Sequence, residues 1–478
     1  MNTIIYNKLM ELEKEKRIPF HMPGHKRMGK EMFQNVYGMD ITEITGYDNL
    51  HNPEGIIRES MNQLKEIYGT EESWYLINGS TVGILASIAA CCAHGDGILI
   101  SRNCHKSVYN AIQLLQLKAY YFAPEMSKEY HVLESIDACG LIEIKNILKQ
   151  HPSIKAVILP SPTYEGVVMD IAALKREIEP YGSVLIVDEA HGAHFIYHDY
   201  FPKSAIECGA DIVIQSTHKT LPAMTQTALL HLCSDKVHPE KIANMLSIFE
   251  SSSPSYILMA SAEYAAAFMN ENVDAVSEYV DNLKNFRNKC EQLKNIHLID
   301  TRDICCNDYD KGKLVFSVKD TQWDGIRLFH TLLEKYHIEL EMADRYNCIA
   351  MTSVCDTKEM YDALFDALLE IDEKMPQKRS ISIQDKNTGK NNIVPKKILE
   401  SWECNNVDKE KIALEKAEGK IAGAFVMLYP PGIPVLVPGE KIEKETVENL
   451  RYYIYNGYNV IGLSEGQMII LKNRNEKD

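Results

Sequence analysis

Residues 184–192, VLIVDEAHG, and residues 211–219, DIVIQSTHK, decide the fold of this chain. Each stretch contains an uninterrupted apolar run, which is typical of a strand buried on both faces of a parallel sheet. Each run ends in polar and ionisable residues, which places Asp188 and Lys219 at the carboxyl ends of two strands, 31 positions apart. In an open α/β sheet, ligands bind in the crevice outside these strand ends. The two stretches therefore predict a sheet with a binding site at the carboxyl ends of its strands.

The same alternation of short apolar runs and helical patterns extends to both sides of this pair. We expect strands at residues 97–101, 119–122, 156–159, 184–187, 211–215 and 228–232. We expect helices at residues 53–68, 82–92, 107–117, 141–150 and 171–178. Strands separated by helices predict an α/β fold with a mostly parallel central sheet, covered on both faces.

The pattern changes after about residue 254, where helices over 256–292, a strand over 313–318 and a helix over 323–336 indicate a smaller α+β unit. Residues 376–392 are polar and read as a linker. We therefore predict five parts: an N-terminal segment (1–52), a cofactor-binding large domain (53–255), a small α+β domain (256–375), the linker (376–392) and a C-terminal domain (393–478).

The composition excludes some functions. The chain has 478 residues and a net charge of −16, which argues against nucleic acid as the main partner. Its 12 cysteines form no C-x-x-C spacing, so we expect neither a metal site nor a redox motif. No apolar stretch is long enough to span a bilayer, and the charged start does not read as a signal peptide. We expect a cytoplasmic protein with reduced thiols and no membrane partner.

Asp188 and Lys219 together are the pair that a pyridoxal 5'-phosphate enzyme requires. The lysine forms a Schiff base with the cofactor aldehyde, and the aspartate keeps the pyridine nitrogen protonated, so that the ring accepts electrons from a breaking bond at the substrate Cα. Alone, each residue has an ordinary structural explanation, because strand-end aspartates often cap helices and partly buried lysines extend their amines to solvent. The correctly ordered pair favours the cofactor.

A phosphate site is expected at NGST (78–81), between a strand-like run and a helix. Gly79, Ser80 and Thr81 offer backbone and hydroxyl donors at the positive end of the helix dipole. The alternative is an ordinary capped helix with Ser80 or Thr81 as N-cap, and both readings stay open. Ser216 and His218, which flank the lysine, are candidates to complete the phosphate site.

Other candidates follow strand ends. His105 is placed to stack on a flat cofactor, although a loop histidine can instead cap the next helix. Ala190 suits the opposite face of the ring, and His191 either contacts the lining residues or fixes the DEAHG turn. Glu165 and Glu189 are candidates for binding a cationic substrate tail, although solvated surface carboxylates are commoner.

With these residues in place, the chain resembles the bacterial ornithine/lysine/arginine decarboxylases, pyridoxal-phosphate enzymes of the aspartate-aminotransferase-like fold type I, and most of all their shorter biosynthetic type. The matching motifs are PFHMPGHK (19–26), DITEITGYDNLHNPEG (40–55), LINGSTVGILA (76–86), SRNCHKSV (101–108), PSPTYEGVVMDI (160–171), VDEAHGAHF (187–195), QSTHKTLPAMTQTALLH (215–231), ELEMADRYN (339–347) and LYPPGIPVLVPGE (428–440).

The resemblance implies a role for each matching residue. Lys219 is the Schiff-base lysine, Asp188 pairs with the pyridine nitrogen and His105 stacks on the ring. The residues implied around the phosphate are Ser80, Thr81, Ser216 and His218. The resemblance also implies an active site at a homodimer interface, and therefore a homodimer or higher homo-oligomer. The large inducible members carry an N-terminal receiver-like domain, whereas this chain starts almost directly at PGHK, so we do not expect a decamer assembled by that route.

The expected reaction is α-decarboxylation of a basic L-amino acid, with arginine to agmatine in polyamine biosynthesis favoured by resemblance to the short members, and lysine or ornithine as alternatives. Either Lys219 or His105 is the proton donor to Cα. An aminotransferase on the same fold is a rival reading, with Arg302, Arg327 or Arg345 as the carboxylate clamp. A catalytically inactive regulatory homologue on the same fold is the second alternative interpretation.

Overall fold

The computed structural model describes residues 17–21, 24, 26, 36–376, 394–429, 432–455 and 457–472. The predicted linker lies almost wholly outside the described residues, as do parts of the PGHK and YPPGIP motifs. Among the described residues, no helix has the length and apolar character needed to cross a membrane.

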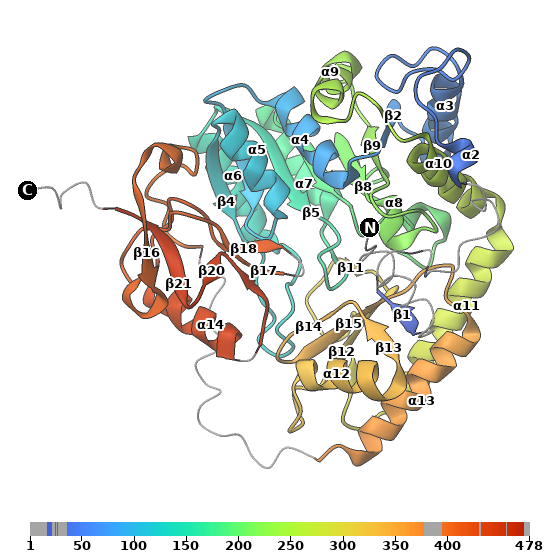
Figure 1. Ribbon diagram of the computed structural model, residues 1–478, viewed down its shortest axis with the longest axis vertical. Coiled ribbons are helices and arrows are strands. Elements are labelled where there is room, and N and C mark those ends of the chain that lie inside the picture. Colours follow the sequence, from blue (N-terminus) through green and yellow to red (C-terminus); the bar gives the residue numbers. More distant parts are fainter. Residues whose placement is uncertain are drawn as a thin grey trace, which may run out of the picture.

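A seven-stranded sheet forms the centre of the molecule (Figure 1). Its order is β2 (Glu72–Leu76), β9 (Ala228–Leu232), β8 (Ile212–Gln215), β7 (Val184–Asp188), β5 (Ile154–Pro160), β3 (Gly97–Ser101) and β4 (Lys118–Phe122). β9 is antiparallel to both of its neighbours, β2 and β8, and all other pairings in the sheet are parallel. The six predicted strands lie within two residues of the observed ones, which confirms the α/β class and the mostly parallel sheet.

Helices cover both faces of this sheet because its strands are apolar on both sides. One face packs α4 (Gly79–Cys91), α5 (Lys106–Leu115), α3 (Ile56–Tyr68), α9 (Pro239–Phe249) and α10 (Tyr256–Glu271). The other packs α6 (Ala138–Gln150) and α7 (Ile171–Ile178). Side chains alternate along each strand, so that in β7 Ile186 belongs to the first core and Leu185 and Val187 to the second. This two-sided burial is what the uninterrupted apolar runs predicted.

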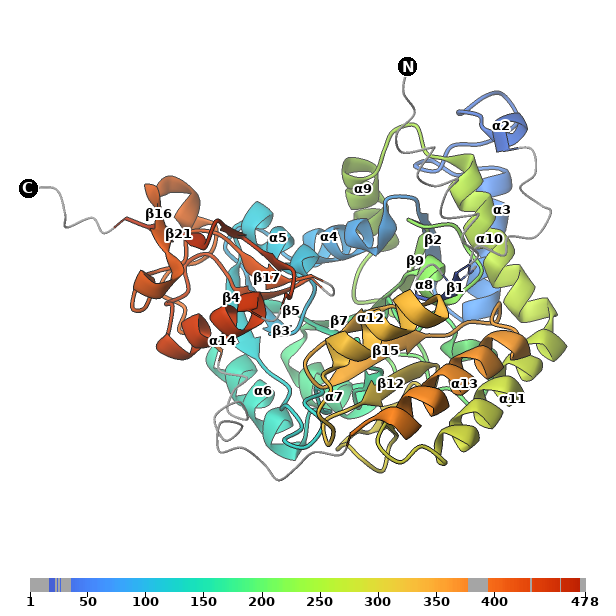
Figure 2. The same ribbon diagram turned by 60° about the horizontal axis from the view of Figure 1, so that its bottom comes forward.

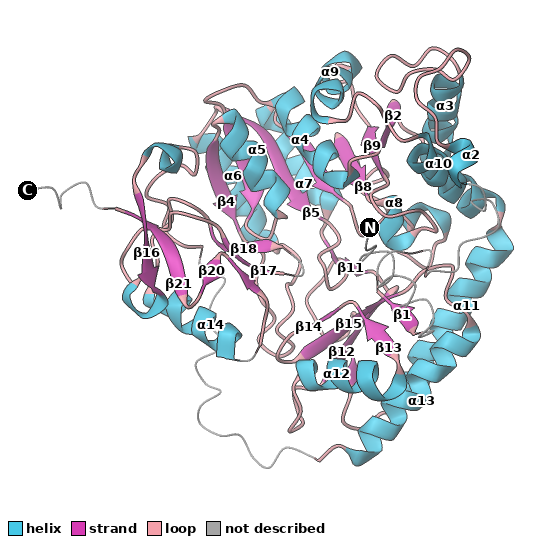
Figure 3. Ribbon diagram, in the orientation of Figure 1, coloured by secondary structure: helices cyan, strands magenta, loops and turns pink. Residues whose placement is uncertain are grey.

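A small unit (residues 273–374) follows the large sheet; the first half of the helical stretch expected at 256–292 is α10, which packs on the large sheet instead. Its antiparallel sheet has the order β10 (His297–Leu298), β12 (Lys313–Ser317), β15 (Asn347–Met351) and β14 (Met342–Ala343). The packed helices are α11 (Val273–Cys290), α12 (Gly325–Tyr336) and α13 (Lys358–Lys374), and Figure 3 shows α11 and α13 side by side. One expectation was wrong here: residues 18–20, expected as loop, form β1 (Ile18–Phe20), which pairs in parallel with β13 (Ile338–Leu340).

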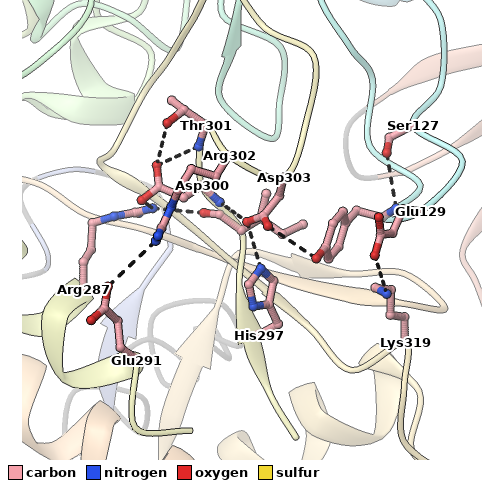
Figure 4. Close-up of polar contacts among 12 residues, drawn as sticks. Ser127, Glu129, Arg287, Glu291, His297, Asp300, Thr301, Arg302, Asp303 and Lys319 are labelled. Carbon is pink, nitrogen blue, oxygen red and sulfur yellow. Dashed lines mark hydrogen bonds and ion pairs between the residues drawn. The ribbon is translucent and has the colours of Figure 1, made fainter. Parts of the chain in front are cut away.

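Contacts between side chains also join the small unit to the large one (Figure 4). Lys319 forms an ion pair with Glu129 at 3.1 Å, and Asp303 bonds both His297 (2.8 Å) and the hydroxyl of Tyr130 (3.4 Å). Nearby, β6 (Val167–Val168) of the large unit pairs with β11 (Asp308–Tyr309) of the small unit. These contacts fix β12 opposite the loops that follow β5 and β7.

A C-terminal unit (residues 394–472) lies beside β4 and α5 in both Figure 1 and Figure 2. It contains two three-stranded sheets, β16 (Lys409–Ala413) with β21 (Gln467–Leu471) and β20 (Leu463–Ser464), and β18 (Ile433–Leu436) with β17 (Val426–Leu428) and β19 (Val460–Ile461). Helix α14 (Lys444–Tyr455) completes its core. The exact domain boundaries stay a prediction.

Candidate active site

The ends of β7 and β8 bring the two predicted key residues to neighbouring positions. Asp188 is the last residue of β7, and the adjacent parallel strand β8 leads into the short helix α8 (Thr217–Thr220), which carries Lys219. Asp188 is buried and accepts a hydrogen bond from the backbone N–H of Ala190. The charges of the two side chains act on each other, because the pKa of each is influenced by the other. The expected pairing of strand ends is therefore present.

Burial shifts Lys219 in the direction of its neutral form. It lowers the pKa of the lysine below its ordinary value, and the negative charges of Asp188 and Glu341 only partly oppose this effect. The same desolvation raises the pKa of Asp188, against the charge of Lys219 and the hydrogen bond from Ala190. A neutral amine is the form that attacks an aldehyde, so this environment suits a nucleophilic lysine.

His191 lies at the centre of the cluster rather than at its margin. Its Nε2 is 3.1 Å from the amine of Lys219, and its Nδ1 is 2.7 Å from the amine of Lys313. The histidine is buried, and desolvation together with the two lysine charges lowers its pKa well below the ordinary value. His191 therefore does more than fix the turn at which it sits.

Lys313 is a residue of this cluster that the sequence reading missed. It begins β12 in the small unit, is 1% exposed, and has a pKa lowered by burial to about 8. The only available signal was a lysine at the start of a fully apolar strand, where a charge is costly. Nothing local could indicate that its partner is 122 positions away.

Glu341 and Tyr164 were also missed, and they face the same cluster. The Tyr164 hydroxyl donates a hydrogen bond to Glu341, and the Tyr164 ring packs edge-on against His191. Glu165, a candidate for the substrate tail, influences the pKa of Lys313, and its Oε2 has no partner among the described residues. Binding of a cationic substrate tail by Glu165 stays a prediction.

Glu189 does not point into the site. Its side chain is buried and accepts hydrogen bonds from Ser204 Oγ (2.7 Å), Ala205 N (2.6 Å) and Gln215 Nε2 (2.7 Å). Because successive side chains of an extended segment alternate in direction, Glu189 faces away from the side occupied by Asp188. The idea that Glu189 binds a cationic tail is therefore wrong.

The N-terminus of α4 offers donors close to the end of β8. The helix starts at Gly79, whose φ of +75° favours glycine, and Asn78 rather than Ser80 or Thr81 takes the N-cap position without a side-chain cap bond. A Cβ at Gly83 would lie 3.1 Å from Ile214, so the helix packs directly on β8. Ser80 and Thr81 are thus not consumed by capping, contrary to the alternative reading.

Two hydroxyls beside Lys219 lack partners. Ser216 Oγ and Thr220 Oγ1 are buried and find no hydrogen-bond partner among the described residues. His218, in contrast, donates from Nδ1 to the carbonyl of Thr227 at 2.8 Å. Buried polar atoms are normally paired, so these orphaned hydroxyls fit a polar group that binds there, such as a phosphate.

His105 both caps a helix and faces the C-terminal unit. Its Nδ1 accepts from the backbone N–H of Ser107 at 3.3 Å, which is the capping role considered from the sequence. Burial and the charge of Lys219 lower its pKa to about 4, so the ring is neutral and lies in the field of the lysine. Its Nε2 is 3.4 Å from an ideal Cβ on Gly432 of the YPPGIP motif. The C-terminal unit therefore contacts the residue expected to stack on the cofactor.

The PGHK motif supports the lysine loop from behind. The Gly24 N–H donates to His218 O at 2.7 Å, and a Cβ at Gly24 would lie only 2.5 Å from Leu221 O. Lys26 is buried and donates to Met351 O at 2.6 Å. Glycine is required at position 24 because the two backbones touch.

The arginines considered as a carboxylate clamp lie elsewhere. Arg302 is 80% exposed beside Glu291, Arg327 covers the Trp323 ring, and Arg345 contacts the rings of Tyr346 and Tyr452 (Arg302 and Glu291 are drawn in Figure 4). None of their described contacts involves Asp188, His191 or Lys219. This arrangement gives the aminotransferase reading no support.

Comparisons with known proteins agree with this geometry. Residues 3–331 match the family model "Orn/Lys/Arg decarboxylase, major domain", and residues 386–456 match its C-terminal domain. A Bacillus subtilis protein named "Uncharacterized protein YaaO" is 33% identical over 98% of both chains. The arginine decarboxylase of Bacillus subtilis is 31% identical over 95% of this chain and 93% of its own. The Francisella novicida lysine decarboxylase LdcF has a similar fold, with a TM-score of 0.79 at 18% identity over 98% of this chain and 82% of its own.

Proposed function

The chain belongs to the Orn/Lys/Arg decarboxylase family and is a decarboxylase of basic amino acids, and from that premise we propose that it converts L-arginine to agmatine with pyridoxal 5'-phosphate. The observation that carries the proposal is the cluster of Asp188, His191 and Lys219 at adjacent strand ends, with a lysine that burial brings toward neutrality. Polyamine biosynthesis is the process that such a reaction serves.

The donor set fits the proposed cofactor. Lys219 offers the amine for its aldehyde, Asp188 a carboxylate for its ring nitrogen, and Ser216 an unpartnered hydroxyl for its phosphate. The complete set of proposed cofactor-binding residues is Gly79, Ser80, Thr81, His105, Asp188, Ala190, His191, Ser216, His218 and Lys219. When bound, the cofactor supplies an aldehyde that captures amines and a protonated ring that accepts the electron pair of the breaking Cα–carboxylate bond.

The residues of the chain prepare this chemistry. Burial favours the neutral amine at Lys219 Nζ, which is the nucleophilic form. The N–H of Ser107 points at Nδ1 of His105, so that the proton of the neutral ring lies on Nε2. The proton donor to Cα is either His105 Nε2 or Lys219 Nζ in its protonated form, and the proposal leaves the choice between them open.

Arginine is proposed over lysine and ornithine because the relative named arginine decarboxylase matches at 31% identity over 95% of this chain, while the lysine decarboxylase LdcA of Pseudomonas aeruginosa matches at 20% over 91% of this chain. The cationic tail of any of the three would suit the carboxylates of Glu165 and Glu341 near the cluster. An aminotransferase remains the alternative activity, without a described arginine in the site to favour it.

The test incubates the protein and pyridoxal 5'-phosphate separately with arginine, lysine and ornithine. We expect CO2 and agmatine from arginine, at a kcat/KM at least about tenfold above those for lysine and ornithine, which corresponds to about 1.4 kcal/mol of transition-state discrimination. Preference for cadaverine or putrescine formation would overturn the choice of substrate. A 2-oxo acid as the product would overturn decarboxylation itself.

We further propose that the protein acts as a homodimer or higher homo-oligomer. Apolar side chains that are about half exposed lie close together in sequence at Ile44, Tyr47 and Ile56, and a second copy of the chain would cover them. Sedimentation equilibrium with and without the cofactor measures the mass, and a monomer under both conditions would contradict this part of the proposal.

A further inference from the structure

Ile77 lies between the end of β2 and the turn that starts α4, and two side chains hold its backbone. The pairing of β2 with β9 ends at Leu76 and Ala228, so Ile77 lies beyond the sheet ladder. Glu250 Oε1 accepts a hydrogen bond from the Ile77 N–H at 2.9 Å, and Gln226 Nε2 donates to the Ile77 carbonyl at 2.8 Å. Because an N–H can only donate and a carbonyl can only accept, the direction of both bonds is fixed.

The residue after Glu250 holds the turn itself. Ser251 donates its N–H to Oδ1 of Asn78 at 3.1 Å. Asn78 occupies the N-cap position of α4, but its side chain makes no cap bond with the helix. The N–H groups at the start of α4 are therefore left for another acceptor, and the helix dipole favours an anion there.

Gln226 also connects this turn to the lysine loop (residues 216–220). The next residue, Thr227, accepts at its carbonyl from Nδ1 of His218 at 2.8 Å. Ser216, at the start of the same loop, has a buried hydroxyl without a partner in the described part of the chain. The two proposed sides of the phosphate site, the start of α4 and Ser216, are thus joined through two consecutive residues.

The backbone of Gln226 is strained in a way that supports a functional role. Its φ of +85° lies in the region that favours glycine, yet the residue is a glutamine with an exposed side chain. Burial does not compensate for strain at an exposed position, and such strain persists only where the surroundings impose it. The bond from the side-chain amide to Ile77 is a contact that glycine could not supply.

Glu250 acts as a hydrogen-bond acceptor for the backbone. It is 7% exposed, and burial raises its pKa to about 7, although the N–H groups of Ile77 and Asn78 lower it. Burying a carboxyl group is costly unless it is hydrogen-bonded, and here the Ile77 N–H supplies the bond. An uncharged oxygen at the same place could accept this bond equally well.

We propose that Gln226 and Glu250 are positioning residues that hold the turn at residues 77–81 in the conformation that binds the phosphate group of the cofactor. The inference rests on the proposed function, because the phosphate belongs to the proposed cofactor. Both side chains act through the backbone of Ile77. Loss of either bond lets the turn leave the binding conformation, and the apparent affinity falls in proportion to the fraction that stays competent.

The experiment measures the binding of two compounds to the full-length protein in the absence of substrate. Pyridoxal 5'-phosphate and pyridoxal share the ring and the aldehyde, and the first alone has the phosphate. Equilibrium dialysis gives a Kd for each, and the ratio of the two values isolates the contribution of the phosphate. In the wild type we expect pyridoxal 5'-phosphate to bind at least about 100-fold more tightly, because a phosphate makes several charge-assisted hydrogen bonds.

The variants should reduce this preference for the phosphate. In Gln226→Gly and in Glu250→Leu we expect the ratio to fall about tenfold, the scale of one buried hydrogen bond, while the Kd for pyridoxal stays unchanged. Glu250→Gln keeps an oxygen acceptor for the Ile77 N–H and should keep the wild-type ratio. Gln113→Ala removes an exposed bond to Asn405 and serves as the control, with both Kd values unchanged.

A comparison of two substitutions at position 226 separates positioning from stability. Gln226→Ala keeps a strained side-chain-bearing residue, whereas Gln226→Gly relieves the strain. Both remove the amide and should lose the same phosphate preference, yet the urea midpoint of Gln226→Gly should be no lower than that of Gln226→Ala. A phosphate preference that follows the urea midpoint instead would contradict the positioning role.

The other outcomes also decide. An unchanged ratio in Gln226→Gly or in Glu250→Leu would overturn the proposal, as would equal losses of affinity for the two compounds. Equal affinity of the wild type for both compounds would overturn it as well, and binding of neither would overturn the proposed cofactor along with it. Strong preference for pyridoxal 5'-phosphate without decarboxylation of arginine would count against the proposed function and leave this inference intact.

Discussion

Two buried polar clusters lie beyond the carboxyl ends of β3 and β7, which are separated in the sheet by β5, and positive charge has opposite surroundings in the two clusters. After β3, Arg102 bonds the Glu440 carboxylate (3.1 Å), the Pro434 carbonyl (2.7 Å) and the Tyr109 hydroxyl (3.0 Å). After β7, His191 bonds two lysines and, within the part of the chain that the structure describes, no carboxylate. The first cluster surrounds a cation with acceptors, whereas the second places cations against a neutral ring.

The pKa values of these groups express the difference. Burial by itself would lower the pKa of Arg102, but Tyr109 and Glu440 raise it, so the guanidinium stays charged. Burial lowers the pKa of Lys219 and Lys313, and their distant carboxylates only partly oppose it. Arg102, which joins two units, is paired with the Glu440 carboxylate. The amine of Lys219, which is proposed to react, has its direct contact with a neutral histidine instead.

The largest expected effect comes from breaking the reactive cluster. Lys219→Ala should lower kcat for decarboxylation by more than about 10³-fold, because it removes the group that binds the cofactor and is a candidate proton donor. Borohydride reduction followed by mass spectrometry should find the phosphopyridoxyl group on Lys219 in the wild type and on no lysine of the site in the variant. Lys219→Arg keeps the positive charge and should be as inactive as Lys219→Ala. Decarboxylation by the Lys219→Arg variant would contradict the role of Lys219.

Breaking the junction cluster should instead affect stability. Arg102→Met leaves Glu440 buried without its cation, and we expect the free energy of unfolding to fall by about 3–5 kcal/mol. Urea unfolding measures the loss, and limited proteolysis should show cleavage between the large and C-terminal units. An unchanged unfolding midpoint would mean that the two units are held together by other contacts.

A pH series sharpens the comparison. The pKa of Lys313 is about 8 when folded and near 10.5 when unfolded, so its contribution to stability is present above the unfolded pKa and is lost as pH falls through about 8. The stability of the wild type relative to Lys313→Met should therefore grow as pH rises from 8 toward 10.5. Urea unfolding of both proteins at several pH values tests this, and a difference that shrinks with rising pH would contradict it.

The smallest effect is expected where charges are exposed. Glu129 is 64% exposed, and Lys319 also contacts Asp320 at 2.9 Å, so Glu129→Gln should change the free energy of unfolding by no more than about 1 kcal/mol. The same urea assay provides the baseline for Arg102→Met. A loss as large as that of the buried pair would show that burial is not what separates the two cases.

Local patterns predicted the central sheet and its strand ends. Runs such as VLIVD are apolar at every position because helices cover both faces of the strand, and this is visible without any partner. The same reasoning brought Asp188 and Lys219 together, because neighbouring parallel strands end at the same edge. In contrast, β1 was missed because its three residues are too few to show a strand pattern, and they form a strand only by pairing with β13.

The candidate site was predicted where its residues follow strands of one sheet, and missed where another unit supplies them. Lys313 and Glu341 come from the small unit, and Gly432 reaches His105 from the C-terminal unit. Glu189 was misjudged for a different reason: its neighbour Asp188 faces the site, but an extended chain turns the next side chain to the other side. Sequence spacing indicates strand ends, while the meeting of separate units depends on tertiary packing.

The pairing of β1 with β13 bears on the order in which the protein can be completed. Arg17, just before β1, forms an ion pair with Glu339 of β13, 322 positions away, so β1 has no strand partner until most of the polypeptide has been synthesised. Contacts of such long range slow folding, because a large loop must close before they form. The nascent N-terminus therefore waits in an unpaired state, and its arrival, together with Gly24 against the lysine loop, is a late step in assembling the catalytic centre.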